Sequence, residues 1–218
     1  MKTLIRVKRL VGWSVAAVLL MCGSVSRADL TGVTDWYNST GVEYCYPAFS
    51  VPQYSDPLLG ISATQTNAGP VSMWGTIIAN SISDPNLIIN NQINNESGVD
   101  WASFTVDVYM STSFSLGFPA TPVVSPSGWT GTISVTPHNT VGTTWWGQIT
   151  FTGGTPVSAN LLSPDNLLDY TYKILNFSGS TSYSFQQDVT VVPVPEPATF
   201  SLLGLGTLML VSKFRRRN

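Results

Sequence analysis

Hydrophobic and polar residues alternate with a period of two through most of the middle of this 218-residue chain. The clearest segment is WASFTVDVYM at 101–110, in which one side carries Phe104, Val106, Val108 and Met110 and the other carries Ser103, Thr105 and Asp107. The same period is found in 129–137, 145–151 and 181–192, and less regularly in 71–79, 86–93, 113–118 and 169–177. Such a period is typical of β-strands that bury one face. It predicts six to nine strands, with the adjacent Trp145 and Trp146 on opposite faces.

Turn-forming residues separate these segments. NNESG at 94–98 predicts a hairpin, and SPSG at 125–128 and TGG at 152–154 predict further turns. One short helix is expected near 163–170, with Ser163 as its N-cap and Pro164 at its first position. No helical period is sustained and no repeat has a fixed length. The middle of the chain, residues 29–192, is therefore predicted to be an all-β domain, an antiparallel β-sandwich in preference to a closed barrel.

The first 28 residues have the layout of a secretory signal peptide. Basic residues precede an apolar stretch that begins at Leu10, and the small residues Ser26 and Ala28 stand before Asp29. We expect export by the Sec translocon and cleavage between Ala28 and Asp29. Two alternatives are a lipoprotein, which would use Cys22 but has the large Met21 before it, and a retained N-terminal anchor.

The chain from 193 to 218 joins three features in a fixed order. The prolines of VPVPEPA favour an extended backbone. Residues 198–212 carry no charge, and as a helix they would be about 22 Å long, shorter than the hydrocarbon core of a bilayer. A basic cluster follows, Lys213, Arg215, Arg216 and Arg217, which is expected to stay on the cytoplasmic side. This pattern predicts a short membrane helix that holds the chain temporarily, and a plain anchor with a proline-rich stalk is the alternative.

The triplet Pro195-Glu196-Pro197, the short Gly/Leu-rich run and the terminal arginines closely resemble the PEP-CTERM sorting signal of Gram-negative bacteria. The resemblance implies that an exosortase recognises the triplet, cleaves near it and directs the protein from the inner membrane to the cell surface or beyond. It also implies an association with bacteria that make exopolysaccharide and form biofilms. The triplet would then be substrate and not catalyst.

The net charge of the middle domain excludes some classes of partner. Between residues 29 and 192 one basic residue, Lys173, stands against eleven acidic residues, which gives a formal charge of 1 − 11 = −10. Such a surface repels phosphate backbones and anionic lipid headgroups, so nucleic acid is excluded as a partner.

The inventory of reactive side chains predicts that the chain is not an enzyme. His138 is the one histidine and is expected in a polar turn, and Cys45 is the one cysteine of the predicted mature chain and is expected to be buried. No catalytic triad or zinc site can be assembled from these. A glycosidase needs only two carboxylates, and Asp100 and Asp107 around the 101–110 strand leave that alternative open.

Two kinds of ligand remain open. Calcium needs only oxygen ligands, and Asp84 with Asn86, and Asp165 with Asn166 and Asp169, place such groups in predicted loops; no metal site is assigned, and a calcium-dependent adhesion module stays an alternative. The tryptophans, Trp36, Trp74, Trp101, Trp129, Trp145 and Trp146, are expected mainly in the core, although an exposed ring can stack on a sugar. The Thr132, Ser134 and Thr136 face is too short and irregular for ice binding. The preferred prediction is an exported, non-catalytic surface or matrix protein that associates with exopolysaccharide.

Overall fold

The computed structural model describes residues 30–51, 56–80, 82, 85–120, 124–140 and 142–195. The predicted signal peptide and the predicted C-terminal membrane helix lie outside these residues. In the part of the chain that is described, no helix has the length and apolar character needed to cross a bilayer.

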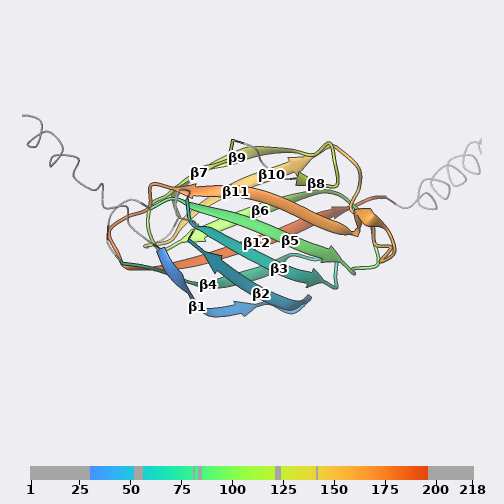
Figure 1. Ribbon diagram of the computed structural model, residues 1–218. Helices are drawn as coiled ribbons and strands as arrows, with labels where there is room; N and C mark the ends of the chain where they lie inside the picture. Colours follow the sequence, from blue (N-terminus) through green and yellow to red (C-terminus); the bar gives the residue numbers. More distant parts are fainter. Residues whose placement is uncertain are drawn as a thin grey trace, which may run out of the picture.

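Two β-sheets make up the described chain (Figure 1). Sheet A has the strand order β1–β4–β12–β6–β10–β9. In that order its strands are Leu30–Asn38, Val71–Ala79, Ser182–Pro193, Trp101–Met110, Trp145–Thr152 and Thr130–Asn139. Sheet B has the order β2–β3–β5–β11–β7, with strands Val42–Ser50, Leu58–Gln65, Leu87–Asn95, Leu167–Leu175 and Ser115–Gly117, and the short β8 (Val124–Ser125) pairs with β11. The all-β prediction is confirmed, and the twelve strands exceed the six to nine expected.

The chain changes sheet repeatedly as it advances. The strands β1, β4, β6 and β12 belong to sheet A, whereas β2, β3, β5 and β11 belong to sheet B. The predicted hairpin at 94–98 is therefore wrong, because β5 and β6, on either side of this turn, lie in different sheets. Sheet B also contains one parallel pair, β3 with β5, where an antiparallel sheet was expected. The chain reverses twice between these two strands because β4, in the other sheet, stands between them.

One hydrophobic core fills the space between the sheets. The predicted inward positions of β6 are confirmed, since Phe104, Val106 and Val108 are fully buried. The Phe104 ring of sheet A stacks on Phe151 at a centroid distance of 4.5 Å and meets the Tyr170 ring of sheet B at 4.9 Å. Aromatic rings thus join the two layers at the centre of the core.

A polar network crosses the same core. Gln187 lies on the inward face of β12 and is fully buried, although its neighbours on that face, Tyr183, Phe185, Val189 and Val191, are the apolar residues that the sequence predicts. The Gln187 side chain accepts a hydrogen bond from the Tyr172 hydroxyl at 2.9 Å and donates one to Asn91 Oδ1 at 2.5 Å. Since Tyr172 and Asn91 belong to sheet B, the network ties β12 to β11 and β5.

Several local predictions change in the structure. The predicted helix is a single 3-10 turn, Pro164–Asn166, whose Ser163 N-cap oxygen accepts a hydrogen bond from the Asp165 backbone N–H, as expected. His138 lies on β9 and not in a turn, because the strand continues to Asn139. Cys45 is half-buried against the core and accepts a hydrogen bond from Trp36 Nε1 at 3.2 Å.

Candidate functional site

Six side chains form one continuous row across the outer face of sheet A. In order across the strands they are His138 (β9), Trp146 (β10), Tyr109 (β6), Gln186 (β12), Trp74 (β4) and Tyr37 (β1), and each is the direct cross-strand partner of the next. We call this set the outer row. Strands lie 4.7–4.9 Å apart, so five steps between six strands make the row roughly 24 Å long.

The rings of the outer row sit close together. His138 meets Trp146 edge-on at a centroid distance of 5.3 Å, and Tyr37 stacks with Trp74 at 6.2 Å. Tyr37 is 56% exposed and Trp74 is 36% exposed, so both rings reach solvent. Four aromatic residues and one imidazole thus line a single stripe of an otherwise polar sheet face.

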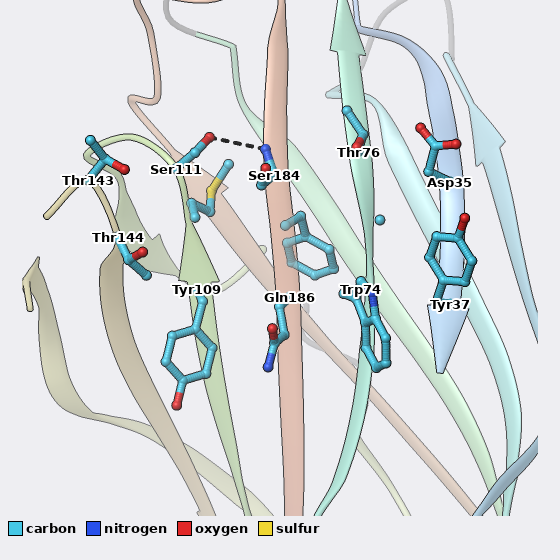
Figure 2. A pocket seen from close by; sticks show the side chains of 13 residues that line it. Asp35, Tyr37, Trp74, Thr76, Tyr109, Ser111, Thr143, Thr144, Ser184 and Gln186 are labelled. Carbon is cyan, nitrogen blue, oxygen red and sulfur yellow. Dashed lines mark hydrogen bonds between the residues drawn. The ribbon is translucent and has the colours of Figure 1, made fainter. Parts of the chain in front are cut away.

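Four members of the outer row, Tyr109, Gln186, Trp74 and Tyr37, line a hollow of about 420 Å³. Figure 2 shows Tyr109, Gln186, Trp74 and Tyr37 side by side across four neighbouring strands, with Asp35 on the side of Tyr37 and Thr143 on the side of Tyr109. Besides the two tyrosines, hydroxyl-bearing residues that line the hollow are Thr76, Ser111, Thr143, Thr144 and Ser184. The site therefore combines flat apolar rings with many hydroxyl, amide and carboxylate groups.

A second cross-strand row carries two carboxylates directly beside the outer row. Asp107 on β6 pairs in register with Asp188 on β12. Asp107 Oδ1 accepts hydrogen bonds from Trp146 Nε1 and Gln148 Nε2, both at 2.9 Å, and Asp188 Oδ1 accepts one from Gln186 Nε2 at 2.8 Å. These bonds fix the planes of Trp146 and Gln186 relative to the sheet. The pKa of the nearby Tyr109 is raised, first by partial burial and then by the charges of Asp107 and Asp188.

Strand alternation explains why these side chains face outward. On β10, Trp145 packs against the core, so Trp146 must point to the outer face, as the sequence predicts. On β4, the buried Gly75 stands between Trp74 and Thr76, and a Cβ atom there would lie 2.7 Å from the Trp36 ring. Glycine at this position lets Trp36 pack under the edge of the sheet while Trp74 remains outside.

The outer face of sheet A carries no lysine or arginine among the described residues. The one basic side chain described, Lys173, lies on β11 of sheet B and pairs with Asp56 at 2.8 Å. The charge around the outer row is therefore negative, and it comes from Asp107, Asp188 and Asp35.

The structure separates the acids that the sequence suggested as a pair. Asp100 precedes β6 and Asp107 lies seven residues further along the extended strand, so about 23 Å separates them. Glycosidase carboxyl groups stand roughly 5–10 Å apart, which excludes Asp100 and Asp107 as partners in one reaction. The neighbour of Asp107 is instead Asp188, which sequence reasoning missed.

Two of the residues considered for calcium, Asn166 and Asp169, have different surroundings. Asn166 is buried and its amide donates to the Asn95 carbonyl at 2.7 Å, whereas Asp169 accepts from Gln92 on the outer face of sheet B. Asp84 lies outside the described residues. Within the described ranges, no group of three or more His, Cys, Asp or Glu side chains is placed to hold a metal ion.

The tryptophans divide between core and surface. Trp101 and Trp129 are buried, and their indole N–H groups donate to Ser97 Oγ and to the Thr155 carbonyl. Trp74 and Trp146 belong to the outer row. On β9, the hydroxyl of Ser134 bonds Gln148 Oε1 and accepts from Thr150, so these hydroxyls pair with one another.

Comparison with protein families matches residues 193–217 to the PEP-CTERM protein-sorting motif. The chain carries a PEP-CTERM signal. The motif supports an exported protein that an exosortase sorts. No curated protein and no solved structure matches the chain.

The PEP-CTERM motif begins at Pro193, the last residue of β12. Val194 donates its backbone N–H to the Asp100 carbonyl at 2.7 Å, and Pro195 is exposed. Glu196 and Pro197 lie outside the described residues, as do Ala28, Asp29, Lys213, Arg215, Arg216 and Arg217. The sorting motif thus follows the folded domain with almost no spacer.

Proposed function

We propose that this PEP-CTERM protein is a non-catalytic component of the cell surface or extracellular matrix that binds extracellular polysaccharide along the outer row of sheet A. The observation that carries the proposal is the register of Trp146, Tyr109, Trp74 and Tyr37 across one exposed sheet face. A sorting signal that leads out of the cell agrees with a polymer as partner.

The chemistry of the outer row suits a sugar chain. A pyranose ring has an apolar C–H face that packs on an aromatic ring, and its edge carries hydroxyl groups that need polar partners. In the outer row the rings of Tyr109 and Trp74 stand two strands apart, about 10 Å, with Gln186 between them. That interval is comparable to the length of a disaccharide, so alternate sugars of an extended chain would meet Tyr109 and Trp74.

Charge selects the class of polysaccharide. The domain has a formal charge of −10, and Asp35, Asp107 and Asp188 lie on or beside the site. A polymer of uronic acids would be repelled, whereas the carboxylates accept hydrogen bonds from neutral sugar hydroxyls or from amino sugars. The ligand we propose is therefore a neutral or cationic glycan.

A second candidate function is a carbohydrate-active enzyme that uses Asp107 and Asp188. Opposite residues of antiparallel strands have Cβ atoms about 5 Å apart, within the range of a retaining carboxylate pair. Asp107 Oδ1, however, already accepts two hydrogen bonds from Trp146 and Gln148, which favours a fixed structural carboxylate. We prefer the binding function for this reason.

The test uses the protein released from cells and three soluble polymers: neutral hydroxyethylcellulose, neutral dextran and anionic alginate. Affinity electrophoresis should show retardation by a neutral polymer and none by alginate at physiological salt. Trp74→Ala should weaken binding at least about tenfold, since loss of a central aromatic contact typically costs 1–2 kcal/mol or more. The matched control, Tyr46→Ala, removes a 65% exposed ring from sheet B and should leave binding unchanged.

Three results would contradict the proposal: retardation by alginate alone, equal effects of the two substitutions, or release of reducing ends from the polymer. Reducing ends that disappear in both Asp107→Asn and Asp188→Asn would establish the enzyme instead.

A further inference from the structure

Two leucines project into solvent from one loop of the domain. Leu162 is 93% exposed and Leu161 is 62% exposed, in the segment that joins β10 to the 3-10 turn before β11. Fully exposed leucine is ordinary when it is single, but two adjacent side chains form a protruding apolar tip.

Hydrogen bonds hold this loop in a defined shape. Asn160 accepts at its side-chain oxygen from the Leu162 N–H at 3.1 Å and at its carbonyl from the Ser163 N–H at 2.8 Å. Asn160 also donates its own N–H to Ser158 Oγ at 3.1 Å, and the Ser158 N–H donates to the Asp165 carbonyl at 2.9 Å. The loop therefore presents both leucines on a hydrogen-bonded frame.

Asp100 joins this loop to the point where the sorting motif leaves the domain. Its carboxylate accepts from the Ala159 N–H at 2.7 Å, and its carbonyl accepts from the Val194 N–H at 2.7 Å. Val192, which is 49% exposed, adds apolar surface beside that point. In Figure 1 the end of β12 and the start of β11 lie at the same end of the domain.

The length of the motif limits how far this end can stand from a membrane. The uncharged run begins at residue 198, five residues after Pro193, and five residues span at most about 18 Å. We propose that, while the PEP-CTERM tail is inserted and before cleavage, Leu161 and Leu162 dip into the lipid surface and hold the domain against the bilayer. This inference rests on the membrane step of sorting and is independent of the glycan site.

Charge indicates the kind of lipid surface. Glu96, Asp100 and Asp165 lie at this end, and among the described residues the single basic side chain, Lys173, is not near it. Contact with lipid must therefore be apolar, and anionic headgroups weaken it. The orientation also has a consequence for the outer row: Tyr109 lies eight residues along β6 from Trp101, about 26 Å from the membrane end. The glycan site then lies toward the end of the domain that is remote from the bilayer before the protein is released.

The experiment reconstitutes residues 29–218, which keep the PEP-CTERM tail and lack the predicted signal peptide, in vesicles of zwitterionic phosphatidylcholine. An environment-sensitive fluorophore is attached to Leu162→Cys, in a background where Cys45 is serine, and Thr181→Cys, an exposed position beside the start of β12 at the opposite end, is the matched control. We expect the label at 162 to show blue-shifted emission and to be quenched by spin-labelled lipid, whereas the label at 181 stays aqueous. Adding anionic lipid should reduce the quenching at 162. A label at Leu161→Cys repeats the measurement if the first variant does not fold.

Each other outcome has a separate meaning. A chain that does not float with the vesicles has no inserted tail, which overturns the sorting step of the proposed function. A chain that floats but keeps an aqueous label at 161 and 162 overturns the lipid contact alone. A label that becomes buried only when exosortase is added assigns the leucines to that protein and also overturns the lipid contact.

Discussion

Gln187 and Tyr172 share a buried hydrogen bond. We therefore predict that the effect of Tyr172→Phe on the free energy of unfolding depends on which residue stands at position 187. Gln187 links sheet A to two strands of sheet B through Tyr172 and Asn91. A side chain of similar size without polar atoms, in Gln187→Leu, leaves the Tyr172 hydroxyl and Asn91 Oδ1 buried without these partners. Tyr172→Phe alone leaves Gln187 Oε1 without its donor.

The magnitudes follow from the cost of an unsatisfied buried group, about 1–3 kcal/mol each. Gln187→Leu leaves two buried groups, the Tyr172 hydroxyl and Asn91 Oδ1, without this partner, but it also buries additional apolar surface. We therefore expect a loss of about 2–4 kcal/mol in the free energy of unfolding. Tyr172→Phe should lose about 1–3 kcal/mol in the native background. In the Gln187→Leu background the Tyr172 hydroxyl has already lost its hydrogen bond to Gln187. The same Tyr172→Phe change should therefore be neutral or stabilising there.

Urea unfolding followed by tryptophan fluorescence measures all four members of this double-mutant cycle. Tyr183→Phe is the matched control: its hydroxyl is buried and has no hydrogen-bond partner among the described residues, so its removal should cost nothing. An equal cost of Tyr172→Phe in both backgrounds would refute the coupling and with it the polar link between the sheets.

Three further predictions concern the core. Phe104→Ala should lower the free energy of unfolding by about 3–5 kcal/mol, because the ring is fully buried and stacks on Phe151; a urea-derived loss below about 1 kcal/mol contradicts that packing. Burial raises the pKa of Tyr170 and of Tyr172 far above the ordinary value of 10, so the unfolded chain releases these two protons at a lower pH than the folded chain does. The free energy of unfolding should therefore fall as the pH rises above about 10. Absorbance of tyrosinate from these two residues should therefore appear together with unfolding by circular dichroism, and ionisation before unfolding contradicts their burial. Burial also raises the pKa of Cys45, so its reaction with a thiol reagent at neutral pH should be slow until urea is added, and equal rates in both states contradict the fold at β2.

The sequence alone predicts the parts of this fold that depend on local pattern. The alternation in β6 and β12 is regular because both strands lie inside sheet A with one face on the core, and the inward positions match the buried residues. The proline-rich triplet, uncharged run and arginines likewise occur within one short segment.

Features that depend on distant pairing have no local signal. The sequence does not show that Asp107 and Asp188, 81 residues apart, are neighbours, or that residues from six strands align in the outer row. The turn residues at 94–98 predict that the chain reverses. They do not predict which sheet the next strand joins.

None of the three strands before residue 71 was predicted, and two of them are irregular. β1 and β2 are edge strands with irregular register, and Asp35 and Tyr44 have positive φ angles of 51° and 49°. These irregularities break the period of two that identifies a strand from its sequence.

The most direct test of the outer row as a glycan site is a titration of the released protein with cello-oligosaccharide, a short neutral relative of the polymers above, followed by NMR of the tryptophan indole N–H groups. We predict that the resonances of Trp74 and Trp146 move during the titration, while those of the buried Trp101 and Trp129 stay in place. Binding that leaves Trp74 and Trp146 unchanged, or that moves only the buried pair, would contradict the assignment of the site.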